Sequence, residues 1–86
     1  MVKVRMYQTD WCPFCRRAEA LLRQKGVVEI EMIDVVLDAK GRAELQAKTG
    51  RRTVPQIYIG ETHVGGCDDL YALDRAGTLE SLLAAA

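Results

Sequence analysis

Two cysteines, Cys12 and Cys15, lie at the point where the spacing of apolar residues changes from that of a strand to that of a helix. Residues 2–7 alternate apolar and polar side chains, which predicts a strand, and residues 14–25 place apolar side chains at helical spacing. Cys12 therefore falls at the N-cap of the predicted helix. Pro13 falls in its first turn, where a missing N–H costs nothing. A sulfur at this position faces free backbone N–H groups and the positive end of the helix dipole, and both favour the thiolate.

The spacing of the two cysteines is compatible with two kinds of chemistry. Thiolates attack disulfides, and Cα atoms one helical turn apart are about 5–6 Å apart, within disulfide range. This predicts Cys12 as an exposed nucleophile and Cys15 as a buried resolving thiol. A C-x-x-C pair is equally half of many zinc sites, so spacing alone does not decide. The strand before the pair and Pro13 within it favour redox chemistry, and no second C-x-x-C or H-x-x-x-H completes a zinc site.

Composition limits the remaining function classes. The 86 residues predict one domain, 1–86, with 12 basic and 12 acidic residues and no net charge. We expect no nucleic-acid partner and no membrane partner, since no apolar run approaches the roughly 20 residues of a membrane span. Met1 leads directly into a charged strand, so no signal peptide is expected. Three cysteines are an odd number for a secreted disulfide framework, which favours a cytoplasmic protein.

The rest of the chain alternates between strand and helix patterns. We expect strands at 28–32, 56–59 and 62–65, helices at 39–49 and 67–76, and a last short turn at 78–83. Caps are expected at Asp38, Gly50 and Thr78, and a two-residue type II′ turn at Gly60-Glu61. The helix at 39–49 has a thin apolar face, formed by Ala39, Ala43, Leu45 and Ala47. The first two strands should be parallel and the last two a hairpin, giving an α/β fold with a small mixed sheet covered by helices.

Three motifs in this order resemble those of the glutaredoxins, most closely the short bacterial dithiol members. They are Cys12-Pro13-Phe14-Cys15, Thr53-Val54-Pro55 before the hairpin, and Gly65-Gly66-Cys67-Asp68-Asp69 before a helix. The resemblance extends from Val4 to about Ala76. It implies a thioredoxin fold, with a small four-stranded mixed sheet and helices on both faces. It also implies a glutathione-dependent thiol–disulfide oxidoreductase that works through the redox-active pair Cys12 and Cys15.

The same resemblance implies a glutathione site. The expected glutathione-binding residues are Phe14, Arg51, Thr53, Val54, Pro55, Gly66, Cys67 and Asp68. Pro55 would follow a cis peptide bond, and the backbone of Val54 would pair with the cysteinyl unit of glutathione. The helix N-terminus at Gly66–Asp68 suits the γ-glutamyl carboxylate, while Asp68 or Asp69 suits its ammonium. Arg51 or Arg52 could meet the glycyl carboxylate.

The sequence departs from the family pattern just before the first cysteine. Many members carry a lysine there, whereas this chain has Gln8-Thr9-Asp10-Trp11 and no cation. The thiolate of Cys12 should therefore depend more on the helix terminus for its stabilisation than it does in members that have this lysine. We interpret Trp11 as an exposed residue at the rim of the site and His63 as a surface residue. Cys67 is expected to be a half-buried contact without a catalytic function.

Partners and alternatives follow from the resemblance. Glutathione is the expected reducing co-substrate, and protein disulfides and glutathionylated proteins are the expected substrates of a monomer that needs no metal. One alternative is an iron–sulfur carrier, a dimer that holds its cluster through Cys12 and glutathione. The second cysteine disfavours it, because Cys15 competes for Cys12. Another alternative is a thioredoxin-like reductase served directly by a flavoprotein, which the glutathione-binding segment at Cys67-Asp68-Asp69 disfavours.

Overall fold

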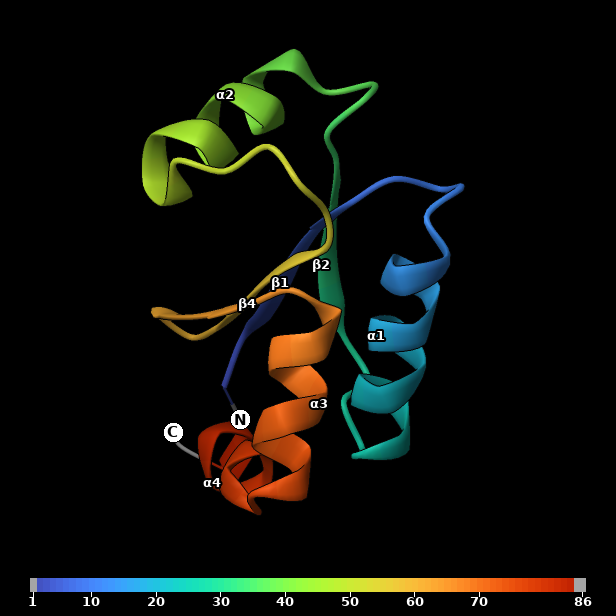
Figure 1. Ribbon diagram of the computed structural model, residues 1–86, viewed down its shortest axis with the longest axis vertical. Helices are drawn as coiled ribbons and strands as arrows, with labels where there is room; N and C mark the ends of the chain where they lie inside the picture. Colours follow the sequence, from blue (N-terminus) through green and yellow to red (C-terminus); the bar gives the residue numbers. More distant parts are fainter. Residues whose placement is uncertain (1, 85–86) are drawn as a thin grey trace.

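A computed structural model describes residues 2–84, so the two ends of the predicted domain, residue 1 and residues 85–86, lie outside the description. Strands and helices follow one another in the order that the sequence predicts (Figure 1). The described elements are β1 (Val4–Gln8), α1 (Pro13–Gln24), β2 (Ile30–Asp34), α2 (Ala39–Thr49), β3 (Gln56–Ile59), β4 (Thr62–Gly65), α3 (Cys67–Arg75) and α4 (Thr78–Ala84).

The strands form one mixed sheet in the order β2-β1-β3-β4. β1 runs parallel to β2, with Met6 opposite Met32, and antiparallel to β3, with Met6 opposite Ile57. β3 and β4 form the predicted antiparallel hairpin. Gly60 in its turn has φ +61°, whereas the following Glu61 does not have positive φ, a combination that fits type II′ and excludes type I′. This is the topology of the thioredoxin fold, so the predicted fold class is confirmed.

One face of the sheet is covered by α1 and α3, which lie side by side, with α4 at the end of α3 (Figure 1). The core on this face joins the inward side chains of β1 and β3 to the apolar stripes of these helices. Its most deeply buried members are Val4, Met6, Ala18, Leu22, Ile57, Leu70 and Leu79. The 3.6-residue spacing that the sequence shows in residues 14–25 is this contact face of α1.

The other face is covered by α2, and here two sequence predictions need correction. Tyr7, which alternation placed among the polar residues of β1, is fully buried with Leu45, and its hydroxyl donates to the Glu44 carboxylate on α2. β1 is therefore a central strand with both faces covered at this point. The predicted alanine face of α2 is wrong, because Ala39, Ala43 and Ala47 are exposed and only Gly41 and Leu45 are buried.

Several element boundaries also differ from the prediction; β1, for example, spans Val4–Gln8 and not residues 2–7. β2 begins at Ile30 rather than at Val28, which is exposed before the strand. Thr78 is the first residue of α4 instead of the cap before it. The predicted caps Asp38 and Gly50 are confirmed at the two ends of α2. Of the helices among residues 2–84, none combines the length and the apolar character that crossing a membrane requires.

Candidate active site

Cys12 occupies the N-cap position of α1, as predicted. Its backbone is extended, with φ −87° and ψ 110°, and its Sγ atom accepts a hydrogen bond from the backbone N–H of Cys15 at 3.2 Å. Pro13 takes the first helical position. The half-buried Cys12 side chain also lies 3.8 Å from the carbonyl oxygen of Val54, to which a thiol proton can donate. The N-terminus of α1 thus holds one partly accessible sulfur against a backbone donor.

Cys15 lies one turn further along α1 and is fully buried. Burial, and after it the side-chain hydrogen bond with Cys12, raise the pKa of the Cys15 thiol to about 12. A backbone hydrogen bond with Thr9 and the charge of Arg16 act in the opposite direction. At neutral pH Cys15 therefore keeps its proton. The predicted inequality of the two thiols, one accessible and one buried, is present in the structure.

The peptide bond between Val54 and Pro55 is cis, which confirms that prediction. The Val54 carbonyl lies beside Cys12, since the two meet in the 3.8 Å contact. Cys12 comes from the turn after β1, and Val54 from the segment before the neighbouring antiparallel strand β3. The sheet order therefore brings these two distant segments to one edge.

Thr53 is held by a hydrogen-bonded chain of side chains that the sequence did not reveal. Gln56, the first residue of β3, is buried, and its amide Nε2 donates to Thr53 Oγ1 at 3.2 Å. Its carbonyl Oε1 lies 2.8 Å from His63 Nε2 on β4, so with this amide orientation the imidazole is the donor. The His63 ring stacks on Tyr58 with 4.9 Å between centroids. Burial, followed by the nearby charge of Arg51, lowers the pKa of His63.

The N-terminus of α3 faces the same edge and is capped by Asp69. The backbone N–H of Gly66 donates to Asp69 Oδ2 at 2.9 Å. Gly65 has φ +110°, and a Cβ there would collide with the same carboxylate, so both conformation and space require glycine. The sequence left Asp68 and Asp69 as alternatives for binding an ammonium group. Asp69 Oδ2 is engaged in the cap, whereas the exposed Asp68 carboxylate has no hydrogen-bond partner among the described residues, which favours Asp68 as the ligand-binding carboxylate.

These segments surround one pocket of about 230 Å³, whose lining includes Phe14, between the two cysteines in sequence, and Val54, whose carbonyl contacts Cys12. It is lined by Phe14, Arg51, Thr53, Val54, Pro55, Gln56, Gly66, Cys67, Asp68 and Asp69. All of the residues expected to bind glutathione are in this set, and Gln56 and Asp69 join them. Larger hollows of about 440 and 430 Å³ lie elsewhere on the surface, so proximity to the thiols, not size, singles out this one. That these residues bind glutathione stays a prediction.

Phe14, which lines this pocket, lies against a neighbouring arginine side chain. Phe14 is 54% exposed, and the Arg17 guanidinium lies 5.9 Å from the centre of its ring and 5.3 Å from that of Tyr71. Arg17 is thus held against two rings by cation–π contacts and is not merely a solvated side chain. Burial raises the pKa of the Cys67 thiol, and Arg17 opposes this shift. Trp11 is 81% exposed, which confirms its predicted exposure.

The zinc alternative finds no ligand set in the structure. Within residues 2–84 there is no group of three or more His, Cys, Asp and Glu side chains placed to hold a metal ion. All three cysteines are free thiols. A partly accessible Cys12 sulfur at a helix N-terminus, one turn from the buried Cys15 thiol, is suited to exchange of disulfides.

The sheet order and the unequal thiol pair together place the chain among the thioredoxin-fold proteins that exchange disulfides through paired cysteines. The family model named Glutaredoxin matches residues 4–64. The chain belongs to the glutaredoxin family, a family of thiol–disulfide oxidoreductases.

Individual relatives agree with this assignment. The chain is 56% identical over 87 residues to a glutaredoxin of Pseudomonas aeruginosa, covering 99% of this chain and 100% of that one. Its fold is similar to the solution structure of a Brucella melitensis glutaredoxin, with a TM-score of 0.81 and 54% identity, covering 96% of this chain and 89% of that one. A crystallised buckwheat glutaredoxin–glutathione complex has a TM-score of 0.84 at 32% identity, covering 95% of this chain and 76% of that one.

Proposed function

We propose that this protein reduces protein disulfides and glutathione mixed disulfides at Cys12 and Cys15, with glutathione as the electron donor. The observation that carries the proposal is the 230 Å³ pocket beside the thiols. It combines a helix N-terminus, a strand-like segment with a free backbone edge, and an arginine, which are complementary to the parts of glutathione. The buckwheat relative, which was crystallised as a glutathione complex, supports the same ligand.

The pocket suggests how glutathione would lie. The first N–H groups of α3 have no partner within the helix, so they suit the γ-glutamyl carboxylate, and Asp68 suits the neighbouring ammonium. The backbone of Val54 offers strand-like hydrogen bonds to the cysteinyl unit and directs its sulfur toward Cys12. Arg51 lines the pocket and Arg52 does not, which favours Arg51 as the partner of the glycyl carboxylate.

The chemistry proceeds by two exchanges. The Cys12 thiolate attacks one sulfur of the substrate disulfide, a Cys12–substrate disulfide forms, and the other sulfur leaves as a thiolate. Forming this mixed disulfide removes the charge and the hydrogen bond of Cys12, two of the causes that raise the pKa of Cys15. Cys15 can then lose its proton and attack the Cys12 sulfur, which releases the reduced substrate. Two molecules of glutathione reduce the Cys12–Cys15 disulfide and leave as one molecule of glutathione disulfide.

A second glutathione can replace Cys15 when the substrate carries glutathione itself. Glutathione then attacks the Cys12–glutathione disulfide directly, and one glutathione disulfide again leaves. Because both routes need a reducing glutathione pool, we propose that the protein acts in the cytoplasm. We also propose that it acts as a monomer.

The test is a glutathione-dependent disulfide exchange assay on the purified protein and on Asp68→Ala. Because Asp68 is exposed, its loss should raise the apparent KM for a glutathionylated substrate about two- to fivefold, which is about 0.4–1 kcal/mol, with kcat little changed. Glu61→Ala, which removes one carboxylate from the hairpin turn, serves as the matched control. Absence of glutathione-dependent turnover would refute the function. An unchanged KM in Asp68→Ala would refute the proposed placement of glutathione.

A further inference from the structure

A second hollow, of about 430 Å³, lies between α2 and the segment that leads to β3. It is lined by Val35, Ala39, Arg42, Ala43, Leu45, Gln46, Arg51 and Arg52. Three of these residues are arginines and none is acidic, although the chain as a whole carries no net charge. We refer to this hollow as the arginine pocket. Its positive charge is a local property that composition does not show.

Among residues 2–84, the three arginines lack an acidic partner, as do Arg17, Lys40 and Arg75, whereas the remaining basic side chains form ion pairs. Arg5, Arg16 and Arg23 all form ion pairs with glutamates. In the part of the chain that the structure describes, Arg42, Arg51 and Arg52 form no ion pair.

Arg42 is held in place by a neutral partner. It donates to the carbonyl of Val35 at 2.9 Å, which fixes the side chain without cancelling its charge. The Asp38 carboxylate at the start of α2 is occupied as the helix cap, where it accepts from the N–H of Gly41. Asp38 keeps its negative charge in this hydrogen bond, but it is not among the residues that line the arginine pocket, which carry three positive charges and no negative one.

The arginine pocket adjoins the pocket proposed to bind glutathione. Arg51 lines both hollows. Val54, whose carbonyl contacts Cys12, packs against Val35 and Leu45 in the core below the arginine pocket. The N–H of Val35 donates to the carbonyl of Gln8 at 3.0 Å, so the ends of β1 and β2 are tied together at this edge. A chain that reaches Cys12 along Val54 therefore passes the arginine pocket.

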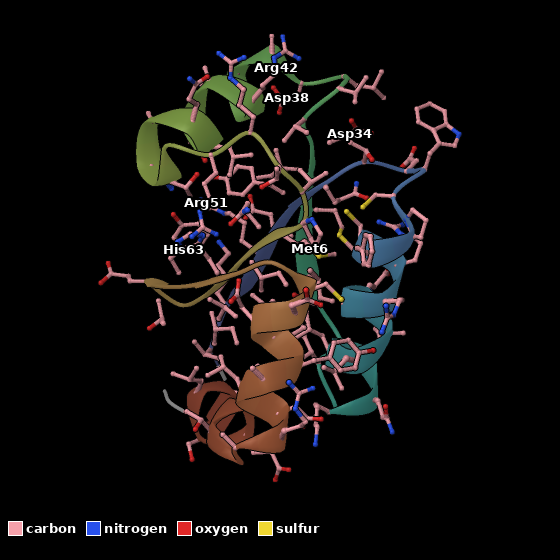
Figure 2. The ribbon with its side chains drawn as sticks, in the orientation of Figure 1. Met6, Asp34, Asp38, Arg42, Arg51 and His63 are labelled. Carbon is pink, nitrogen blue, oxygen red and sulfur yellow. The ribbon has the colours of Figure 1, made fainter. Side chains whose placement is uncertain are left out.

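Exposed apolar side chains extend the surface beyond the arginines. Val36 is 54% and Leu37 80% exposed, in the turn between β2 and α2. Both are held in position, because their N–H groups donate to Asp34 Oδ1 at 2.8 and 3.1 Å. Figure 2 shows Asp34, Asp38 and Arg42 at the same end of the molecule. A fixed turn that exposes two aliphatic side chains beside unpaired arginines fits a polypeptide better than a small anion.

We propose that the arginine pocket binds an acidic stretch of the protein substrate, next to the substrate cysteine that becomes bound to Cys12. The proposal rests on the proposed function and deepens it, since it names the class of protein disulfide preferred. Val54 lies two positions after Arg52 in the chain, a span of roughly 7 Å. The preferred carboxylates therefore lie roughly two to four residues from the substrate cysteine.

The test compares two synthetic peptides that differ only in charge. Each contains one internal disulfide, flanked on both sides by Asp and Glu in the first peptide and by Asn and Gln in the second. The variant is Arg42→Gln/Arg52→Gln, which leaves Arg51 in place. Arg75→Gln, on the last turn of α3, is the control for loss of an exposed arginine charge. The S-glutathionyl derivative of cysteamine, which is too small to reach the arginine pocket, reports the exchange chemistry itself.

We expect the wild-type protein to reduce the acidic peptide with a kcat/KM about tenfold above that for the amide peptide at low salt. The ratio should fall as salt is added. In the double variant the ratio should approach one, while turnover of the amide peptide and of the cysteamine derivative stays unchanged.

Three outcomes would overturn the proposal: equal rates for the two peptides in the wild type, a ratio that survives in the double variant, or an equal loss in Arg75→Gln. An RNA oligonucleotide could also inhibit the wild-type protein more strongly than the acidic peptide does. If that inhibition were absent in the double variant, the pocket would be assigned to nucleic acid instead. Loss of turnover with the cysteamine derivative in the wild type would instead refute the proposed function.

Discussion

At the level of single residues, the structure divides three chemically identical thiols into different environments. Cys12 is half-buried at the N-terminus of α1, whereas Cys15 is fully buried and Cys67 is 5% exposed. Burial raises the pKa of both Cys15 and Cys67. Reactivity toward electrophiles follows the exposed thiolate, so the three should react in a fixed order.

We expect iodoacetamide at pH 7.5 to modify Cys12 at least about tenfold faster than either buried cysteine. Peptide mass mapping after short exposures measures the three rates. In urea the three rates should converge, which is the control for intrinsic reactivity. Modification of Cys67 or Cys15 ahead of Cys12 would contradict the assignment of the nucleophile.

His63 gives a pH dependence whose sign follows from its surroundings. Burial and the charge of Arg51 lower its pKa below the ordinary value of 6.5, so the folded protein favours the neutral ring. The resulting stabilisation is present above pH 6.5 and is lost as the pH falls through the lowered value. In His63→Gln, the free energy of unfolding should therefore fall less between pH 7 and pH 5 than in the wild type. Urea unfolding at several pH values measures this, and equal slopes would contradict it.

At the level of elements, α2 shows a glycine retained against helix propensity. Alanine is normally about 1 kcal/mol better than glycine inside a helix. Gly41, however, is buried where α2 meets β2, and a Cβ there would collide with Ile33 Cγ2. Overpacking of this kind costs about 1–3 kcal/mol, which exceeds the gain in propensity.

We therefore expect Gly41→Ala to lower the free energy of unfolding by up to about 2 kcal/mol. Leucine at position 33 has no Cγ2, so Ile33→Leu should remove the collision and make Gly41→Ala less harmful in the double variant. Chemical denaturation of the wild type, both single variants and the double variant gives the coupling energy. A coupling energy near zero would show that the collision does not decide the choice of glycine.

How well an element could be predicted depends on whether its contacts are periodic in the sequence. α1 begins within one residue of its prediction, because the cap at Cys12, Pro13 and the apolar spacing all agree. The alanine face of α2 was predicted wrongly, because its contact with the sheet rests mainly on Leu45 and Gly41. Tyr7 was placed among polar residues because strand alternation does not report a second covering helix.

At the level of the whole molecule, the sequence motifs identified the segments of the site but not the separate functions of the residues within each segment. The resemblance identified three segments, and the fold brings all three to one pocket. Only the structure shows that Asp69 caps α3 and leaves Asp68 free, and that Arg51 lines the pocket while Arg52 does not. Gln56 was missed because a lone polar residue at a strand start carries no periodic signal.

The two exchange routes proposed above use the whole site and can be separated by substitution. Cys12→Ser should lose all exchange, since both routes begin at this sulfur. In Cys15→Ser the Cys12–glutathione disulfide still forms, and a second glutathione resolves it. Removal of glutathione from substrates should therefore continue at the wild-type rate or faster, because the competing Cys12–Cys15 disulfide is no longer formed.

Reduction of protein disulfides should respond differently to Cys15→Ser. There the substrate must be expelled from Cys12 by a thiol held one turn away, at an effective concentration that free glutathione does not reach. We expect the rate with a protein disulfide to fall at least about tenfold, while the rate with a small glutathione mixed disulfide is retained. Measuring both variants against both substrates separates the routes. If Cys15→Ser lost deglutathionylation as completely as Cys12→Ser, the route through one thiol would be wrong for this protein, and a thioredoxin-like mechanism that needs both cysteines would replace it.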